Sequence, residues 1–363
     1  MQTKKKKQIF RLISTLILTA YFLPSFFTTW AHAAGTDSVI PFSNWQEIIY
    51  AAAKGKHSQV VQLISSGHNV NTQDDERRTP LMYAARRGYF KIAQTLIRHN
   101  ANLEIRDMKG RTALIWAAKG GYSETVKLLI NKNADINVRD KQGKTALHWS
   151  IQRNFPEVAN LLLKKGADIN KRDKNGLSPI ISALQMGHIQ LVTKLLNMGA
   201  DINLRDHQGH NLLWHAMHHN ENELVNSLLP MQLSIKIADT ENLTLLHSAA
   251  KLNYNNVVQF LIKKRANQSA KSKQGNTPLL LAAAYGNNVG LKLLLNNKSD
   301  IDDTNNHLNT ALHLAAHAGH HDVVETLILA GANQNKKNTQ GSTAFDLATR
   351  EGHKEIARLL QKN

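Results

Sequence analysis

Large apolar, small and turn-forming residues recur along this chain at a constant spacing of 33 positions. Each copy opens on a short polar residue, usually Thr, which we number position 0. A large apolar residue follows at +2 and a small one at +5, and no insertion or deletion interrupts the series. Position 0 is occupied by Thr79, Thr112, Thr145, Ser178, Asn211, Thr244, Thr277, Thr310 and Thr343, with Gln46 in a degenerate first copy. A fixed period of this length is typical of stacked repeats.

The pattern within each copy predicts two short helices. The apolar and small residues from +2 to +6 describe a helix with one buried, closely packed face. Gly or Asn stands at +9 in every copy, as at Gly88 and Asn154, and we expect a left-handed helix end there, which other residues enter at a cost. The Val, Ile and Leu residues leading to Leu at +17, such as Leu96, predict a second amphipathic helix.

The remainder of each copy is rich in turn residues. Strings of Gly-Ala-Asp-Ile-Asn (166–170 and 199–203) lead to Asp-x-x-Gly tips (140–143 and 173–176), which predict a turn followed by a hairpin finger. One such unit is too small to bury its own apolar face, whereas ten stacked units bury a continuous core. The sequence therefore predicts an all-α solenoid of helix-turn-helix units with hairpin fingers.

These strings resemble the ankyrin repeat family. The signature of that family is plainest in Thr277-Pro278-Leu279 and in Thr145-Ala146-Leu147-His148, and the resemblance covers about residues 44–363. It implies an ankyrin-repeat solenoid that binds other proteins without a cofactor. The consensus His occurs only at His148, His247 and His313, so the hydrogen bonds that the family makes through it are expected at those copies alone.

The N-terminal segment differs from the repeats. Four lysines and Arg11 precede an uncharged, mostly apolar run that ends in Ala31-His32-Ala33, which is the pattern of a cleaved secretory signal peptide. We therefore expect a signal peptide at 1–33, a linker at 34–44 and the solenoid at 45–363, with the degenerate first repeat at 45–75 and nine repeats after it. An uncleaved anchor is the alternative, because the run is nearly long enough to span a bilayer. Either way we expect export to a periplasm or to the outside of the cell, and the absence of cysteine agrees with this.

Positive charge dominates even without the N-terminal segment. The chain has 45 basic and 27 acidic residues, and five of the bases lie in residues 1–33, which leaves 40 − 27 = +13. In the family that this chain resembles, the fingertips and the end of the first helix face the concave side and contact partners. Carried onto this sequence, those positions are basic in four consecutive copies, at Arg78, Arg86, Arg87, Lys109, Arg111, Lys119, Lys141, Lys144, Arg153 and Lys174.

We call these ten residues the basic face. Asp75 and Glu76 are the opposing charges at the same positions, and Tyr83, Trp116 and Trp149 stand beside them at +4. We hypothesise that the basic face and the three aromatic residues bind an acidic partner, with electrostatic steering and Arg forks supplying specificity. Two other interpretations stay open. The bases can serve solubility, and the aromatic rings can simply pack between helices.

The copy that begins at Asn211 departs from the pattern. Position +21, which is Gly or Asn in the preceding copies, is Gln232 here and then Arg265 and Lys298, and Pro230 lies in the same helix end. Because these side chains enter the left-handed region poorly, we expect an altered helix end or a slight kink. This copy and the turn segment just before it hold several histidines, at His207, His210, His215, His218 and His219. No carboxylate or thiol stands at a spacing that would complete a metal site with them, so the sequence predicts no metal ligands.

No catalytic signature occurs in the chain. It contains no G-x-S-x-G elbow, no phosphate-binding glycine loop and no H-E-x-x-H, and it has no cysteine nucleophile. We expect a monomeric, non-catalytic protein that binds another protein and no small-molecule substrate. The alternatives are binding of an anionic polymer or membrane surface, and delivery into another cell as an effector that binds host proteins.

Overall fold

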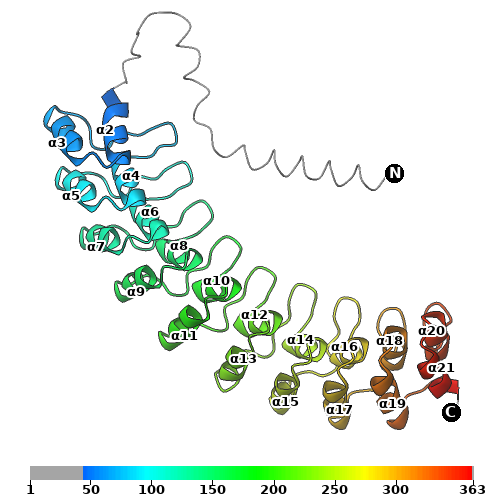
Figure 1. Cartoon of the computed structure of the whole chain (residues 1–363). Helices are drawn as coiled ribbons and strands as arrows, with labels where there is room; N and C mark the ends of the chain where they lie inside the picture. The colour runs from blue at the N-terminus through cyan, green and yellow to red at the C-terminus, as the bar shows by residue number, and fades with distance from the viewer. Residues whose placement is uncertain (1–43, 362–363) are drawn as a thin grey trace, which may run out of the picture. The chain divides into compact units, whose positions relative to one another are not determined.

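The computed structural model describes residues 44–361, and these residues fold into paired helices stacked in two rows (Figure 1). The first-row helices, which begin each repeat, are α2 (Asn44–Ala53), α4 (Pro80–Arg87), α6 (Ala113–Gly120), α8 (Ala146–Gln152), α10 (Pro179–Gln185), α12 (Leu212–His218), α14 (Leu245–Lys251), α16 (Pro278–Ala284), α18 (Ala311–Ala318) and α20 (Ala344–Arg350). The second-row helices are α3 (His57–Ser65), α5 (Phe90–Arg98), α7 (Ser123–Asn131), α9 (Pro156–Lys164), α11 (Ile189–Asn197), α13 (Asn222–Leu228), α15 (Asn255–Lys263), α17 (Asn288–Asn296), α19 (His321–Leu329) and α21 (Lys354–Gln361). The predicted all-α solenoid is confirmed.

From Thr79 onward, position 0 lies immediately before each first-row helix, and in most copies its side chain caps that helix. Ser178 is an exception, because its side chain makes no cap hydrogen bond. Thr79 Oγ1 accepts a hydrogen bond from the Met82 amide at 3.2 Å, which satisfies one of the amides that the first turn leaves without a partner. Where the consensus His is present, the cap is reciprocal. In the last such copy the Thr310 amide donates to His313 Nδ1 at 3.2 Å, and His313 Nε2 donates to the Ser342 carbonyl of the next repeat at 3.1 Å. The cap made by the consensus His is present in all three copies, and the bond to the next repeat is present at His247 and His313. His148 Nε2 is buried and makes no hydrogen bond, so the expectation holds there only in part.

The conformation predicted at +9 is confirmed in all ten copies, from Gly55 (φ 74°) to Gly352 (φ 79°). Asparagine takes the same left-handed conformation where it replaces glycine, as at Asn154 (φ 57°). This turn lets the second helix fold back against the first, so that both apolar faces enter one core. Leu114 and Leu129, at +2 and +17 of one copy, are 1% and 0% exposed. Each such side chain contributes roughly 1.5–3 kcal/mol when fully buried.

The fingers are tight turns that project from the first-row helices on the side opposite the second row (Figure 1). Within residues 44–361, the β-structure is limited to one isolated bridge between Ala238 and Thr244. Neighbouring fingers are joined by a backbone hydrogen bond, such as that from the Lys141 amide to the Lys109 carbonyl at 2.8 Å. The fingers thus form a continuous edge along the stack.

The altered helix end expected near Gln232 is present. Helix α13 stops at Leu228 after seven residues, whereas α11 and α15 have nine. Pro230 has no amide hydrogen to continue the helix, and Gln232 is absent from the left-handed conformations of the described chain. The same expectation was wrong for the next two copies, where Arg265 (φ 59°) and Lys298 (φ 70°) do adopt the left-handed conformation.

The helix-end hydrogen bonds explain this exception. The Ala266 amide donates to the Leu261 carbonyl and the Arg265 amide donates to the Ile262 carbonyl, both at 2.9 Å. This pair of bonds satisfies carbonyls at the end of α15 and offsets the strain of a non-glycine residue.

The predicted signal peptide at 1–33 and nearly all of the linker at 34–44 lie outside the described residues. Helix α2 begins at Asn44, one residue before the predicted start of the solenoid. Between residues 44 and 361, none of the helices combines the length and the hydropathy that a membrane span needs.

Candidate partner-binding face

Each finger on the basic face is built around an aspartate at position −5. Asp107 Oδ1 accepts hydrogen bonds from the Lys109 amide at 2.8 Å and the Arg111 amide at 2.9 Å. Asp74 and Asp140 do the same in their own fingers. Such carboxylate-to-amide bonds fix a turn without a strand ladder. The aspartate therefore determines where the side chains at −1 and +4 can lie.

The second oxygen of the same carboxylate binds those two side chains. Asp107 Oδ2 accepts from Arg111 Nε at 2.9 Å and from Trp116 Nε1 at 3.2 Å, and the Arg111 side chain is only 10% exposed. In the neighbouring repeats, Tyr83 Oη donates to Asp74 Oδ2 and Trp149 Nε1 donates to Asp140 Oδ2, both at 2.8 Å. We call this arrangement of Asp at −5, a side chain at −1 and a ring at +4 the finger triad.

The finger triad gives the aromatic residues an internal role. Trp116 is 7% exposed and Trp149 is 8% exposed, and their indole N–H groups are already bonded. Tyr83 is half-buried, and its burial followed by the hydrogen bond to Asp74 raises its pKa to about 12. The structure thus gives the three rings a packing role, but through hydrogen bonds to the aspartates of the fingers and not simply between helices.

The aspartates of the finger triad were not predicted as opposing charges from the sequence, where Asp75 and Glu76 alone stood against the basic face. In the structure Arg78 Nε lies 2.8 Å from Asp74 Oδ2, and Arg111 is paired with Asp107. The signal was available, because an aspartate occupies −5 in six consecutive copies: Asp74, Asp107, Asp140, Asp173, Asp206 and Asp239.

The other eight cations of the basic face have no ion pair within residues 44–361. Six of them are exposed, and Lys119 and Lys144 are partly buried. These eight cations are Arg86, Arg87, Lys109, Lys119, Lys141, Lys144, Arg153 and Lys174. Their positive charge is therefore the part of the basic face that remains available to a partner.

The indole rings hold several of these cations in place. Lys119 Nζ lies 3.8 Å from the ring centroid of Trp149 in the next repeat, and Arg86 lies 5.0 Å from that of Trp116. Lys144 Nζ, from the finger of the same repeat, lies 5.0 Å from the Trp149 ring. A cation over an indole face is attracted by about 0.5–2 kcal/mol. Cations from two adjoining repeats therefore lie close to the same buried ring, as Lys119 and Lys144 do at Trp149.

The cations of the basic face lie close enough together to lower one another's pKa values. The pKa of Lys119 falls to about 8, first because of burial and then because Arg111, Arg153 and Lys109 repel its charged form. The pKa of Arg86 is also lowered, again by burial and then by Arg87 and Arg78. An anion placed here would relieve this repulsion.

The histidine-rich repeat has a finger triad of different chemistry. Asp206 occupies −5, His210 occupies −1 and His215 occupies +4 on α12, and the ligand atoms of the three side chains all lie within 4.8 Å of one another. His218 stacks on Trp214, whereas His207 and His219 are exposed. The sequence predicted no carboxylate at a spacing that would complete a metal site with these histidines, and the position of Asp206 beside His210 and His215 corrects that expectation.

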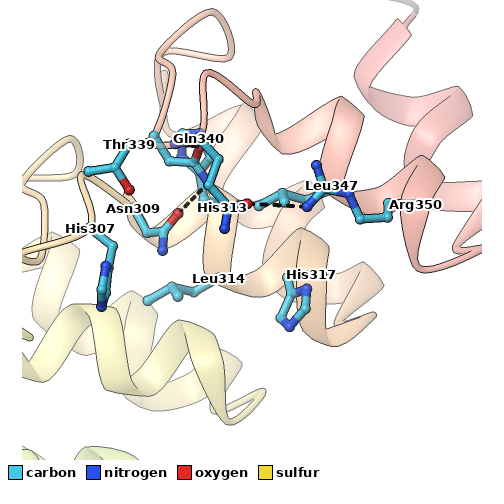
Figure 2. A pocket seen from close by; sticks show the side chains of 10 residues that line it. His307, Asn309, His313, Leu314, His317, Thr339, Gln340, Leu347 and Arg350 are labelled. Carbon is cyan, nitrogen blue, oxygen red and sulfur yellow. Dashed lines mark hydrogen bonds between the residues drawn. The ribbon is translucent and has the colours of Figure 1, made fainter.

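A shallow cavity of about 340 Å³ lies among α18, the finger that follows it and α20 (Figure 2). Its polar side chains bond to one another. Arg350 Nη1 donates to Gln340 Oε1 at 3.3 Å, and Asn338 Nδ2 donates to Asn309 Oδ1 at 3.0 Å. Asn338 replaces the aspartate at −5 here, so this finger lacks the carboxylate of the finger triad.

Comparison with known proteins agrees with this architecture. The family model for ankyrin repeats (three copies) matches residues 48–140, 133–206, 212–305 and 280–363. No curated protein sequence matches the chain. The matched segments cover almost all of the described solenoid, and both the helix pairs and the Thr-His caps lie within them. The chain therefore belongs to the ankyrin repeat family.

Proposed function

We propose that this protein is an exported, monomeric binding module that captures an acidic protein partner on its basic face. Ankyrin repeats are typically protein–protein interaction modules and are generally non-catalytic scaffolds. The observation that carries the proposal is the group of eight cations that have no ion pair within residues 44–361. Cations arranged on a rigid edge attract an acidic surface and orient it.

Burial of the aromatic rings favours a protein over an anionic polymer. Proteins that bind single-stranded nucleic acid commonly stack bases on exposed rings. Trp116 and Trp149 are 7% and 8% exposed and face inward, so they offer no stacking surface. A polymer would have to bind through charge alone, which gives a steep salt dependence and little selectivity.

The test compares two charge reversals. The first variant combines Arg86→Glu, Arg87→Glu and Lys119→Glu. Its control makes the same change in net charge on exposed cations of the second row, with Lys91→Glu, Arg98→Glu and Lys127→Glu. Each protein is used for crosslinked capture from its native compartment, followed by mass spectrometry.

We expect the wild type and the control variant to capture one acidic protein that the first variant does not capture. We also expect the captured protein to be released as salt rises. Equal capture by both variants would refute the basic face as the binding surface. Elution from heparin with a steep salt slope, without any selective protein partner, would instead support the anionic polymer.

Export is tested separately. A reporter fused after residue 40 should cross the membrane, because the lysines before the apolar run are expected to stay in the cytoplasm. A reporter that stays cytosolic would remove the export proposal and leave the binding proposal intact. A reporter recovered in another cell would favour the effector alternative.

A further inference from the structure

Three potential metal ligands converge in the finger and first helix of the fifth regular repeat. Asp206 Oδ2 lies 3.1 Å from His215 Nε2 and 3.5 Å from His210 Nδ1. Ligands bound tetrahedrally to Zn²⁺ at 2.0–2.1 Å are about 3.4 Å apart. These two separations are close to that value, and all three ligand atoms lie within 4.8 Å of one another, so one ion could contact them after a modest rearrangement.

The charge of this finger triad differs from that of its neighbours. In the first and second regular repeats Arg78 and Arg111 provide a permanent positive charge beside the aspartate. Here the side chain at −1 is the imidazole of His210 in place of a guanidinium. A second carboxylate, Asp239 from the following finger, lies 3.3 Å from His210 Nε2.

Both carboxylates are largely enclosed by protein. The Asp206 and Asp239 side chains are 7% and 8% exposed, and within residues 44–361 neither forms an ion pair with Lys or Arg. Burying carboxylates is costly unless a cation balances them. The site therefore has donor atoms for a cation and a charge that a divalent ion would balance.

The groups around the three ligands hold them in binding orientations. Asp206 Oδ1 accepts from the Gln208 and His210 amides at 2.9 Å, which leaves Oδ2 turned toward the histidines. The His210 ring stacks on Trp214 with its centroid 3.4 Å away. His210 Nδ1 is buried and makes no hydrogen bond, although its other nitrogen faces Asp239.

This last contact matches a common feature of metal centres. Histidines that bind metals usually donate their second ring N–H to a carboxylate, which fixes the tautomer and orients the ring. Asp239 is placed to accept that proton from His210 Nε2, which leaves the Nδ1 lone pair for the metal.

We propose that Asp206, His210 and His215 bind Zn²⁺, and that Asp239 positions His210. Two imidazoles and one carboxylate favour zinc over calcium or magnesium, which prefer all-oxygen sites. Three protein ligands leave a fourth position for water or for a side chain of a partner. The site also ties the fifth regular repeat to the finger of the sixth, across the segment where α13 ends early.

The experiment uses the untagged full-length protein, because a histidine tag would itself bind metal. Zn²⁺ binding is measured by calorimetry, and Co²⁺ is added as a spectroscopic probe whose visible absorption distinguishes four-coordinate from six-coordinate sites. The variants are His210→Gln and His215→Gln, each compared with His207→Gln and His219→Gln, which remove exposed histidines nearby.

We expect the wild type and both exposed-histidine controls to bind one Zn²⁺ and to give the four-coordinate Co²⁺ spectrum. Each ligand variant should lose about 100-fold or more in affinity, and Asp239→Asn should lose about 10–100-fold. Zinc should also raise the Tm of the wild type, because it binds only the folded state, and should leave the Tm of His215→Gln unchanged.

The wild-type titration alone can overturn the proposal. A Kd for Zn²⁺ weaker than about 1 mM would do so, as would a six-coordinate Co²⁺ spectrum. Equal Zn²⁺ affinity in the wild type and in a folded His215→Gln variant, with matching far-UV circular dichroism, would likewise assign the bound metal to other histidines.

Discussion

Replacing Asp107 with asparagine tests whether the finger triad holds the repeats together. The Asp107 side chain is 1% exposed and accepts hydrogen bonds from the Lys109 and Arg111 amides, Arg111 Nε and Trp116 Nε1. Arg111 Nη2 also forms an ion pair with it at 2.8 Å. Asparagine keeps one oxygen for the backbone amides but turns an NH₂ toward the other three donors. Arg111 then becomes a buried cation without a partner.

The expected loss in the free energy of unfolding is about 4 kcal/mol. Removing one member of a buried ion pair costs about 3–5 kcal/mol, and a buried donor left without an acceptor costs about 1–3 kcal/mol. The two terms overlap, because the same carboxylate oxygen serves both donors, and so they do not add in full. Asp75→Asn is the matched control, since Asp75 is exposed on the neighbouring finger and its loss should change stability by about 0.5 kcal/mol at most.

Urea unfolding is the appropriate assay because urea, unlike guanidinium, does not screen charge. Unfolding is followed by tryptophan fluorescence and by far-UV circular dichroism, since a solenoid can unfold in stages. Adding Arg111→Met to Asp107→Asn removes the unpaired cation, so the double variant should be more stable than the sum of the single losses predicts, by about 2 kcal/mol. If Asp107→Asn costs no more than Asp75→Asn, the finger triad does not stabilise the stack.

Three further predictions concern backbone conformation and charge. Lys119→Met should raise the free energy of unfolding at pH 7, because the pKa of Lys119 in the folded protein, about 8, lies below the ordinary 10.5 and the charged lysine therefore disfavours folding. The difference in urea midpoint between the variant and the wild type should shrink as pH rises from 8 to 10.5. Arg265→Gly should raise the free energy of unfolding by up to about 1 kcal/mol, whereas Gln232→Gly should lower it by roughly 0.5 kcal/mol, because only Arg265 is left-handed. Gly121→Ala should lower the free energy of unfolding by about 3 kcal/mol and Gly67→Ala by about 1 kcal/mol, both measured in urea. Both glycines are left-handed, but only at Gly121 would the new methyl group meet an aromatic ring, that of Phe155 at 2.7 Å. Equal costs for the two variants would contradict this reasoning.

The features that the sequence predicted well are those determined within a few residues. A helix end needs a left-handed residue wherever the chain turns back, so Gly88 and Asn154 could be assigned from their register alone. The cap at Thr310 and His313 is likewise a local contact. Local hydrogen bonds can also offset an unfavourable residue, which is why the expectation failed at Arg265.

The candidate sites depended on contacts that the pattern does not contain. Aspartate is common in turns, so its presence at −5 did not reveal that Asp107 Oδ2 reaches Trp116 on the following helix. Asp206 and His215 are separated by the same number of residues as Asp107 and Trp116, and they meet because the finger folds back onto the helix that follows it. Aligning positions −5, −1 and +4 across the copies reveals the side chains of both the Asp107 triad and the Asp206 triad.

The finger triad also bears on how such a chain can change by gene duplication. Every group in the Asp107 triad lies between Asp107 and Trp116, so a duplicated repeat whose boundaries fall outside these ten residues carries the whole arrangement with it. The contact of Lys119 with the Trp149 ring crosses a repeat boundary and depends on which repeat comes next. Unequal recombination can therefore lengthen or shorten the stack without unfolding its fingers, while each new repeat order creates a different arrangement of cations.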